Sequence, residues 1–159
     1  MKNLLAAIMI GLVIFCANAS AQSSRAGDEK AIEALMWQMG QTWETGDMAG
    51  LANLLTDNAV HVSPFGEVTT GREEVRRLMQ WVRDVALAKD KIKMTIAQYA
   101  LNFAGADNAI VTFKVVSEIT GQPKPQEDLL TVSVQRVSKQ WKIAHFQGVA
   151  VSEPPIKRS

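Results

Sequence analysis

The hydrophobic pattern of this chain changes from a mostly helical period to a period of two near Lys91, and this change limits the folds that the chain can adopt. Before Lys91, apolar residues recur at helical spacing. After it they alternate with polar residues, as Tyr99, Leu101 and Phe103 do, which is the period of a strand with one buried face. Helices followed by a run of strands predict an α+β domain, with helices gathered on one face of a curved antiparallel sheet.

Three helices are predicted in the first half. The first covers residues 28–45, whose apolar positions share one face: Ile32, Leu35, Met36, Met39 and Trp43. Gly46 ends it, because glycine takes the left-handed conformation without steric cost, and Asp47 can cap a second helix that carries Leu51, Leu54 and Leu55. Thr70 and Glu73 have the spacing of a capping box, which opens the third helix.

The remaining elements are predicted strands. A short strand at 59–63 lies between the second and third helices and ends before Pro64. After Lys91, two alternating stretches flank a turn at 105–108, and a proline-containing hairpin loop at 121–125 leads into strands near 127–138 and 140–151. The order predicts a single domain with no internal repeat and no linker.

The first residues have the pattern of a secretory signal peptide. Lys2 supplies the positive end, residues 4–15 are apolar, and Ala19 and Ala21 are the small residues of a cleavage site. The apolar run is shorter than the about 20 residues that span a bilayer. We therefore expect cleavage before Gln22 and a periplasmic or secreted protein, with a domain at 22–152 and a flexible tail at 153–159.

Composition excludes several kinds of partner. Lys and Arg number 17 against 16 Asp and Glu, so the surface has no excess of basic charge for nucleic acid or for a membrane after signal cleavage. The one cysteine, Cys16, leaves with the signal peptide, and two distant histidines do not form a transition-metal site. No glycine-rich phosphate loop or dinucleotide fingerprint is present, so no metal and no cofactor is expected.

The stretch from Trp43 to Val75 resembles the opening of the NTF2-like superfamily. It joins a helix, the Gly46–Asp47 break, a leucine-rich helix, a short strand, a Pro-Phe-Gly turn and a third helix. The likeness is greatest to the SnoaL-like branch and its DUF4440 (SgcJ/EcaC) group. It implies a cystatin-like cone, in which three N-terminal helices pack on a curved antiparallel sheet that encloses one pocket. The same fold hosts isomerases, cyclases, dehydratases and binding proteins.

Comparison with the ketosteroid isomerases of this superfamily excludes their chemistry. Met39 stands where those enzymes have an oxyanion-binding tyrosine, Ser63 where they have the catalytic base, and Ser133 where they have a second, acidic oxyanion donor. A thioether and two hydroxyls cannot abstract a carbon-bound proton unaided.

The same resemblance implies which side chains face the pocket. As ligand-binding residues it gives Met39, Ser63, Phe113, Val115, Ser133, Gln135 and Phe146, with Val111, Thr131 and Ala144 also inward. Trp43, one helical turn from Met39, is added to the ligand-binding set. His61 shares a strand face with Ser63, whereas His145 alternates out of phase with Phe146 and is expected on the outer face.

His61 is the candidate catalytic residue, and two interpretations of it stay open. It is either a hydrogen-bonded core histidine or an acid–base group that contacts the ligand, since its ordinary pKa suits both. Met39 and Trp43 likewise fit a plain core as well as a pocket wall.

Three functions follow from these observations, because a fold alone does not fix a function. The first is an exported binding protein for small, apolar, ring-containing molecules. The second is a cofactor-independent enzyme of the SnoaL-like type (isomerase, cyclase or hydratase) with His61 as acid–base, and the third is a protein-interaction module. We also expect a homodimer joined through the sheet, with Leu130, Val132 and Val134 forming an apolar outer patch.

Overall fold

The computed structural model describes residues 25–86 and 91–151. The predicted signal peptide (1–21), its cleavage point before Gln22 and the predicted tail (153–159) lie outside these ranges. The chain divides into two compact units, Met1–Ala34 and Leu35–Ser159. The second unit contains the sheet and every candidate site residue, and the fold described below is that of this unit.

The first two helices lie where the sequence pattern predicts them. Residues 25–45 are helical, and Gly46 follows with a φ of 75°, the left-handed conformation that ends the helix. Asp47 caps α2 (Met48–Leu54) by accepting a hydrogen bond of 2.7 Å from the Gly50 N–H. Leu55, which the sequence places on this helix, is instead the first residue of β1 (Leu55–Val62).

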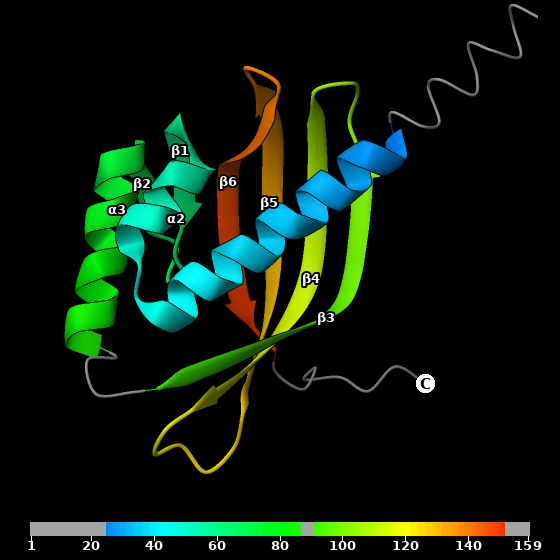
Figure 1. The fold of residues 1–159 in the computed structure, drawn as a ribbon. Coiled ribbons are helices and arrows are strands. Elements are labelled where there is room, and N and C mark those ends of the chain that lie inside the picture. Colours follow the sequence, from blue (N-terminus) through cyan, green and yellow to red (C-terminus); the bar gives the residue numbers. More distant parts are fainter. Residues whose placement is uncertain (1–24, 87–90, 152–159) are drawn as a thin grey trace, which may run out of the picture. The chain divides into compact units, whose positions relative to one another are not determined.

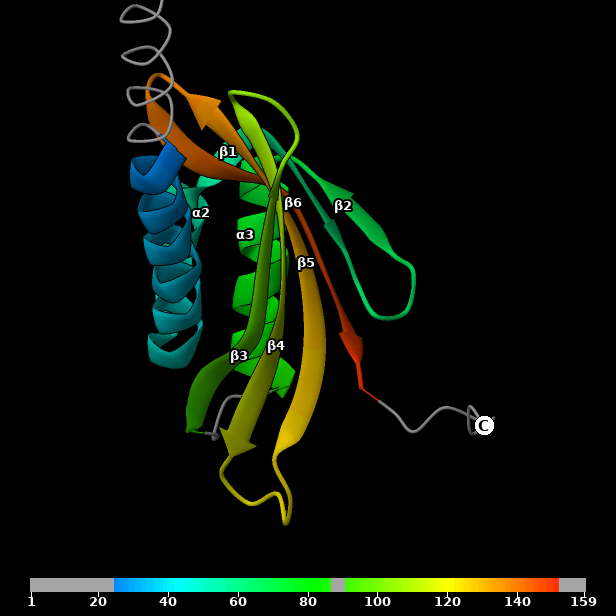
Figure 2. The ribbon, with the colours of Figure 1, turned by 90° about the vertical axis from the view of Figure 1, so that its right-hand side faces the viewer.

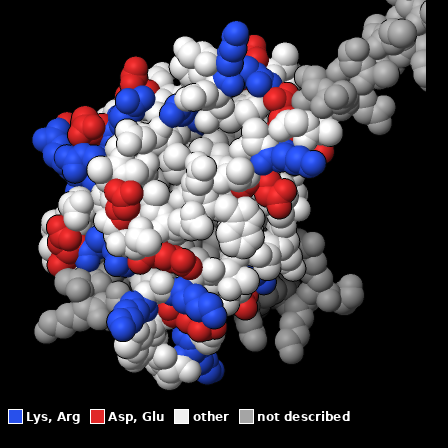
Figure 3. All heavy atoms as spheres, viewed as in Figure 1, with Lys and Arg blue, Asp and Glu red and all other residues white. Residues whose placement is uncertain are grey.

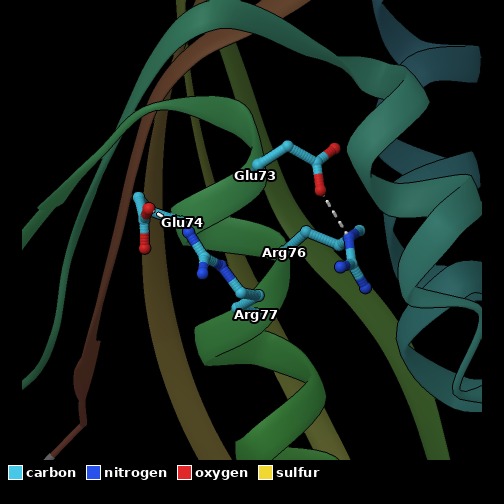
Figure 4. Close-up of polar contacts among 4 residues, drawn as sticks. All are labelled: Glu73, Glu74, Arg76 and Arg77. Carbon is cyan, nitrogen blue, oxygen red and sulfur yellow. Dashed lines mark hydrogen bonds and ion pairs between the residues drawn. The ribbon is translucent and has the colours of Figure 1, made fainter.

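The third helix, α3 (Arg72–Trp81), continues into a π-helical segment, η1 (Val82–Ala86). The predicted capping box is wrong, because the N-cap is Gly71, which has no side chain to offer. Ion pairs join Arg76 to Glu73 at 2.9 Å and Arg77 to Glu74, one turn apart on the exposed side (Figure 4). Charges of both signs are interspersed on the face in Figure 3.

The sheet has six strands in the order β2–β1–β6–β5–β4–β3 (Figures 1 and 2). The other five strands are β2 (Val68–Thr70), β3 (Ile92–Phe103), β4 (Asn108–Ile119), β5 (Gln126–Val137) and β6 (Gln140–Ala150). Helix α3 packs against α2, β1 and β2, and α2 also contacts β1. Both helices therefore lie at the β1–β2 end of the sheet (Figure 1).

The sheet is mixed, so the prediction of an antiparallel sheet is wrong at one position. Strand β1 pairs with β6 in parallel, whereas all other neighbouring strands are antiparallel. A parallel pair needs a long connection rather than a hairpin. The chain between β1 and β6 contains α3 and four other strands, which supplies that length.

Burial identifies one face of the sheet, here called the inner face. On β4 its residues are Ala109, Val111, Phe113, Val115 and Ser117, each at most 7% exposed. Residues directly opposite each other on neighbouring strands share a face. The registers of the strands therefore assign every paired position to the inner face or to the opposite, outer face.

The sequence-based prediction of which β5 residues face inward is wrong. Val132 lies opposite Val111 and Leu130 opposite Phe113, so these side chains are on the inner face. Val132 and Val134 are at most 1% exposed. The three aliphatic side chains expected to form an outer patch for a dimer partner are thus turned toward the interior. The apolar half of an alternating strand faces the core because its burial removes apolar surface from water.

Strand β3 bends in its middle, as Figure 1 shows. Its register against β4 shifts between Ala97 and Ala100, and Gln98 there has a φ of 52°. This is a β-bulge, in which two residues of one strand face one residue of the partner and bend the strand.

Candidate functional site

His61 lies near the end of β1 on the inner face. Its register partner on β6 is Phe146, and the centroids of the two rings are 4.6 Å apart at an interplanar angle of 52°. His61 is only 9% exposed. His61 is therefore the polar member of a buried aromatic pair at the junction of the two parallel strands.

The environment of His61 favours its uncharged form. Burial lowers the pKa of the imidazole below its ordinary value of 6.5, and the charge on His145 lowers this pKa further. The Nδ1 atom of His61 is buried and has no hydrogen-bond partner among the described residues. A neutral imidazole can accept or donate one hydrogen bond at such an atom, according to its tautomer.

An apolar row extends from His61 across the inner face. Phe146 on β6 lies opposite Val132 on β5, which lies opposite Val111 on β4, which in turn lies opposite Leu101 on β3. Phe146, Val132 and Val111 are at most 6% exposed. The row places one imidazole beside a continuous run of buried apolar side chains.

The neighbouring row contains Phe113, Leu130 and Gly148, which are register partners across β4, β5 and β6. Phe113 is 2% exposed and Val115, two residues further along β4, is 1% exposed. A Cβ atom at Gly148 would meet Leu130 at 3.7 Å, an ordinary contact distance. Because Gly148 has no side chain, the inner face is recessed at this position, two residues from Phe146 on β6.

Two of the expected ligand-binding residues are on the other face. Ser133 lies opposite Ile110 and His145, and Gln135 lies opposite Asn108 and Lys142. The expectation that Ser133, Gln135 and Thr131 point inward is therefore wrong. Ala144 occupies a bulge in β6, because Ser133 pairs with His145 whereas Val134 pairs with Ile143. The bulge brings Ile143 and Phe146 to the same face.

Ser63 is engaged in the turn after β1. Its Oγ accepts hydrogen bonds from the Phe65 N–H at 3.2 Å and from the Glu67 N–H at 3.1 Å. The backbone of Ser63 adds two more bonds within the same turn, to Glu67 and Gly66. This hydroxyl shapes the β1–β2 hairpin, as serine commonly does in turns.

Met39 and Trp43 are half-buried on the helix that ends at residue 45. An open groove of about 520 Å³ lies between this helix and α2, and most of its lining residues are of polar types: Gln38, Gln41, Thr42, Glu44, Thr45, Asp47, Gly50 and Leu54. The groove contains none of the expected site residues. On the first helix its polar residues Gln38, Gln41, Thr42 and Thr45 recur every three or four residues, as on one face of a helix.

Residues missed by the sequence analysis complete the surroundings of His61. They are Thr69, its half-buried partner on β2, together with Val132, Leu130 and Gly148. The alternation of apolar and polar residues along β5 could have indicated that Leu130 and Val132 face the interior. No sequence pattern distinguishes Gly148, because its role depends on the register of two strands.

Within residues 25–86 and 91–151, no three His, Cys, Asp or Glu side chains are placed to hold a metal ion. In the same ranges, none of the helices has the length and the apolar character needed to cross a membrane.

A six-stranded mixed sheet with helices and an apolar inner face defines the class of NTF2-like proteins with a cystatin-like fold. Residues 38–146 match the model of the SnoaL-like domain, and the chain belongs to this family. No curated protein shows significant similarity to the chain.

Solved structures resemble the chain in fold at low sequence identity. An NTF2-like protein with a cystatin-like fold from Novosphingobium aromaticivorans has a TM-score of 0.76 and 16% identity over 87% of this chain and 92% of its own. A proposed dehydratase of the NTF2-like family from Streptomyces avermitilis has a TM-score of 0.70 and 21% identity over 80% and 99%. A cystatin-like domain of unknown function from Nostoc punctiforme has a TM-score of 0.70 and 20% identity over 79% and 78%.

Proposed function

We propose that this protein binds small, apolar, ring-containing molecules against the inner face of its sheet. The observation that supports this is the buried inner-face row from His61 through Phe146 and Val132 to Val111, where one imidazole adjoins a run of apolar side chains. Small-molecule sites are commonly built in this way, from apolar walls and a few polar groups that orient the ligand.

The expected affinity is micromolar. Covering about 200 Å² of apolar ligand surface contributes about 5 kcal/mol at about 25 cal/mol per Å². The loss of ligand freedom offsets part of this gain, so nanomolar binding is not expected.

A ligand screen tests the proposal. Steroids, flavonoids and small polyketides are added to the protein while the melting temperature and the tryptophan fluorescence are measured. Trp43→Phe is the control, because the other three tryptophans of the chain also contribute fluorescence. Phe113→Trp, which adds volume to the inner face, should abolish any shift. If no compound changes the melting temperature and Phe113→Trp leaves every activity intact, a protein-interaction module replaces the binding function.

The second candidate function is a cofactor-independent enzyme with His61 as acid–base. The buried, unpartnered Nδ1 of His61 favours it, since a neutral imidazole can take up a proton from a bound substrate. The Streptomyces avermitilis relative is itself named as a proposed dehydratase. With a substrate in hand, His61→Ala separates the two functions: turnover lost with binding retained supports the enzyme, whereas unchanged turnover overturns it.

We further propose that the chain is exported after cleavage before Gln22 and that it forms a homodimer through the outer face of the sheet. Leu129 and Val149 are register partners on that face and are 37% and 51% exposed. A twofold partner would cover this apolar pair. The intact mass of protein secreted by the native host tests the export, and a species that retains Cys16 would contradict it.

A further inference from the structure

The outer face of the sheet has a centre without charged residues. The strand registers define two rows that cross all six strands on this face, and neither row contains Asp, Glu, Lys or Arg. The first row consists of Thr70, Val60, His145, Ser133, Ile110 and Asn102, and the second of Val68, Val62, Gln147, Thr131, Thr112 and Ala100. His145 is the titratable side chain of these two rows.

Charged residues lie at the border of this uncharged centre, and their partners are on the same subunit. One row away on one side, the Nζ atom of Lys142 donates a hydrogen bond of 2.6 Å to the carbonyl of Asn53. One row away on the other side, Lys114 forms an ion pair of 2.9 Å with Glu127. A centre depleted of charge with a polar rim is the composition of a protein–protein interface.

The described residues leave this face open. Val68 is 66% exposed and Ile110 is 43% exposed, whereas the inner-face residues of β4 are at most 7% exposed. Six strands about 4.8 Å apart span about 24 Å, and four rows about 6.7 Å apart span about 20 Å. A partner that covers this area would bury about 1,000 Å² over both subunits, which reaches the size of a specific interface.

His145 lies at the middle of this surface. Its strand β6 and the neighbouring β5 are the two central strands of the sheet, and Ser133 on β5 is its register partner. In a twofold dimer both subunits use the same patch, so residues at the centre of the patch meet their own copies near the axis. A second copy centred here therefore brings the partner's His145 close to His145. Neutral imidazoles can exchange hydrogen bonds there with hydroxyls such as those of Ser133 and Thr131.

We infer that His145 lies at the centre of the dimer interface and that the dimer dissociates when this imidazole is protonated. This inference rests on the proposed homodimer and adds its regulation by pH. A buried imidazolium needs a counter-ion, and neither row contains a carboxylate. Two such charges near the axis would also repel each other. Ser133 on β5 and Val60 on β1, which face His145, do not titrate, and the nearby charges of Lys142 on β6 and of His61 on the opposite face would only add repulsion.

The dissociation constant of the dimer at two pH values tests the inference. It is measured by analytical ultracentrifugation at pH 7.5 and pH 5.5, at one ionic strength. Histidine is the side chain that ordinarily takes up a proton in this range. Because two imidazoles must lose their protons for each dimer that forms, we expect the dissociation constant to be at least tenfold larger at pH 5.5. Circular dichroism at both pH values checks that the protein stays folded.

Three variants assign the pH dependence to one side chain. His145→Asn keeps a neutral, hydrogen-bonding group and should form a dimer with the same dissociation constant at both pH values. His145→Lys has a permanent charge and should be monomeric at pH 7.5. His61→Gln, which removes the other histidine of the chain, is the matched control and should retain the pH dependence of the wild type.

A measurement on the wild-type protein is independent of how the variants fold. Followed by NMR, His145 should take up its proton at a lower pH in concentrated protein, where the dimer predominates, than in dilute protein. A dimer with equal dissociation constants at both pH values, or a pH dependence that survives His145→Asn, would overturn the inference and leave the homodimer in place. A wild-type protein that is monomeric at pH 7.5 would instead contradict the proposed homodimer itself.

Discussion

His61 and His145 lie on adjacent parallel strands but on opposite faces of the sheet. His61 pairs with Phe146, whereas His145 pairs with Val60, the residue before His61. The two imidazoles are therefore separated by the thickness of the backbone, and the charge on His145 lowers the pKa of His61 in addition to the effect of burial.

This arrangement predicts a pH dependence of stability. Because folding lowers the pKa of His61 below 6.5, the unfolded chain binds the proton more readily as the pH falls past that value. The contribution of His61 to the free energy of unfolding should be constant above about pH 6.5. It should decrease as the pH falls below that value, until the pKa of His61 in the folded state is passed. Urea unfolding at several pH values measures this free energy.

Two variants control this pH prediction. In His61→Leu the decrease between neutral pH and the onset of carboxylate titration should be absent. In His145→Gln it should become smaller, because one of the two causes of the lowered pKa is removed. An unchanged pH profile in His61→Leu would contradict the assignment of the effect to this residue.

Side chains added at Gly148 should block the inner face in proportion to their size. Gly148→Ala should fold and bind ligand normally, since the new Cβ would lie 3.7 Å from the nearest Leu130 atom. Gly148→Leu projects beyond this point beside Phe146 and should weaken binding of any compound found in the ligand screen by more than tenfold. Melting temperatures of both variants, measured beside the titrations, separate a blocked site from an unfolded protein.

Ser63 should matter for stability and not for binding. Ser63→Ala removes the acceptor of two turn hydrogen bonds, at 3.2 and 3.1 Å, and should lower the free energy of unfolding by about 1 kcal/mol. Ligand affinity should stay within about twofold, a small free-energy change. Ser133→Ala, on the outer face, is the comparison and should change neither quantity much. Loss of binding in Ser63→Ala but not in Ser133→Ala would contradict this prediction and would show that Ser63 contributes to the binding site.

A charge at the outer apolar pair should prevent dimerisation. Leu129→Lys places an ammonium opposite Val149, where a twofold partner would have to bury it. Light scattering at tens of micromolar protein, a concentration suited to a stable interface, should report a dimer for the wild type and a monomer for this variant. Val132→Ala is the control, because Val132 is on the inner face. A monomeric wild-type protein would contradict the proposal.

Much of the fold could be predicted from local chemistry. Gly46 and Asp47 fix the break between the first two helices through backbone conformation and a cap, both of which depend only on neighbouring residues. Period-two alternation predicted β4 and the final two strands to within a residue or two. The parallel pairing of β1 with β6 could not be predicted in this way, because it depends on where two distant strands meet.

The candidate site was harder to predict for the same reason. Phe113, Val115 and Phe146 are on the inner face as expected, since each lies in a regular stretch of its strand. The bulge at Ala144 and the reversed parity of Ser133 and Gln135 depend on register, and position-by-position comparison with distant relatives does not preserve register through a bulge. The apolar residues of β5 themselves indicated the correct face.

Because of the bulge at Gln98, the residue number alone does not give the face of a side chain along β3. Ile96 and Leu101 are five residues apart, an odd number, yet both pair with buried residues of β4, Val115 and Val111, which are four apart. One extra residue reconciles the two counts. Deleting a single residue between Ile96 and Leu101 would therefore remove the bulge and its bend, while both residues would stay on the inner face. A family alignment that matches β3 without a gap to a strand lacking this residue would misassign the face of every β3 residue on one side of the bulge.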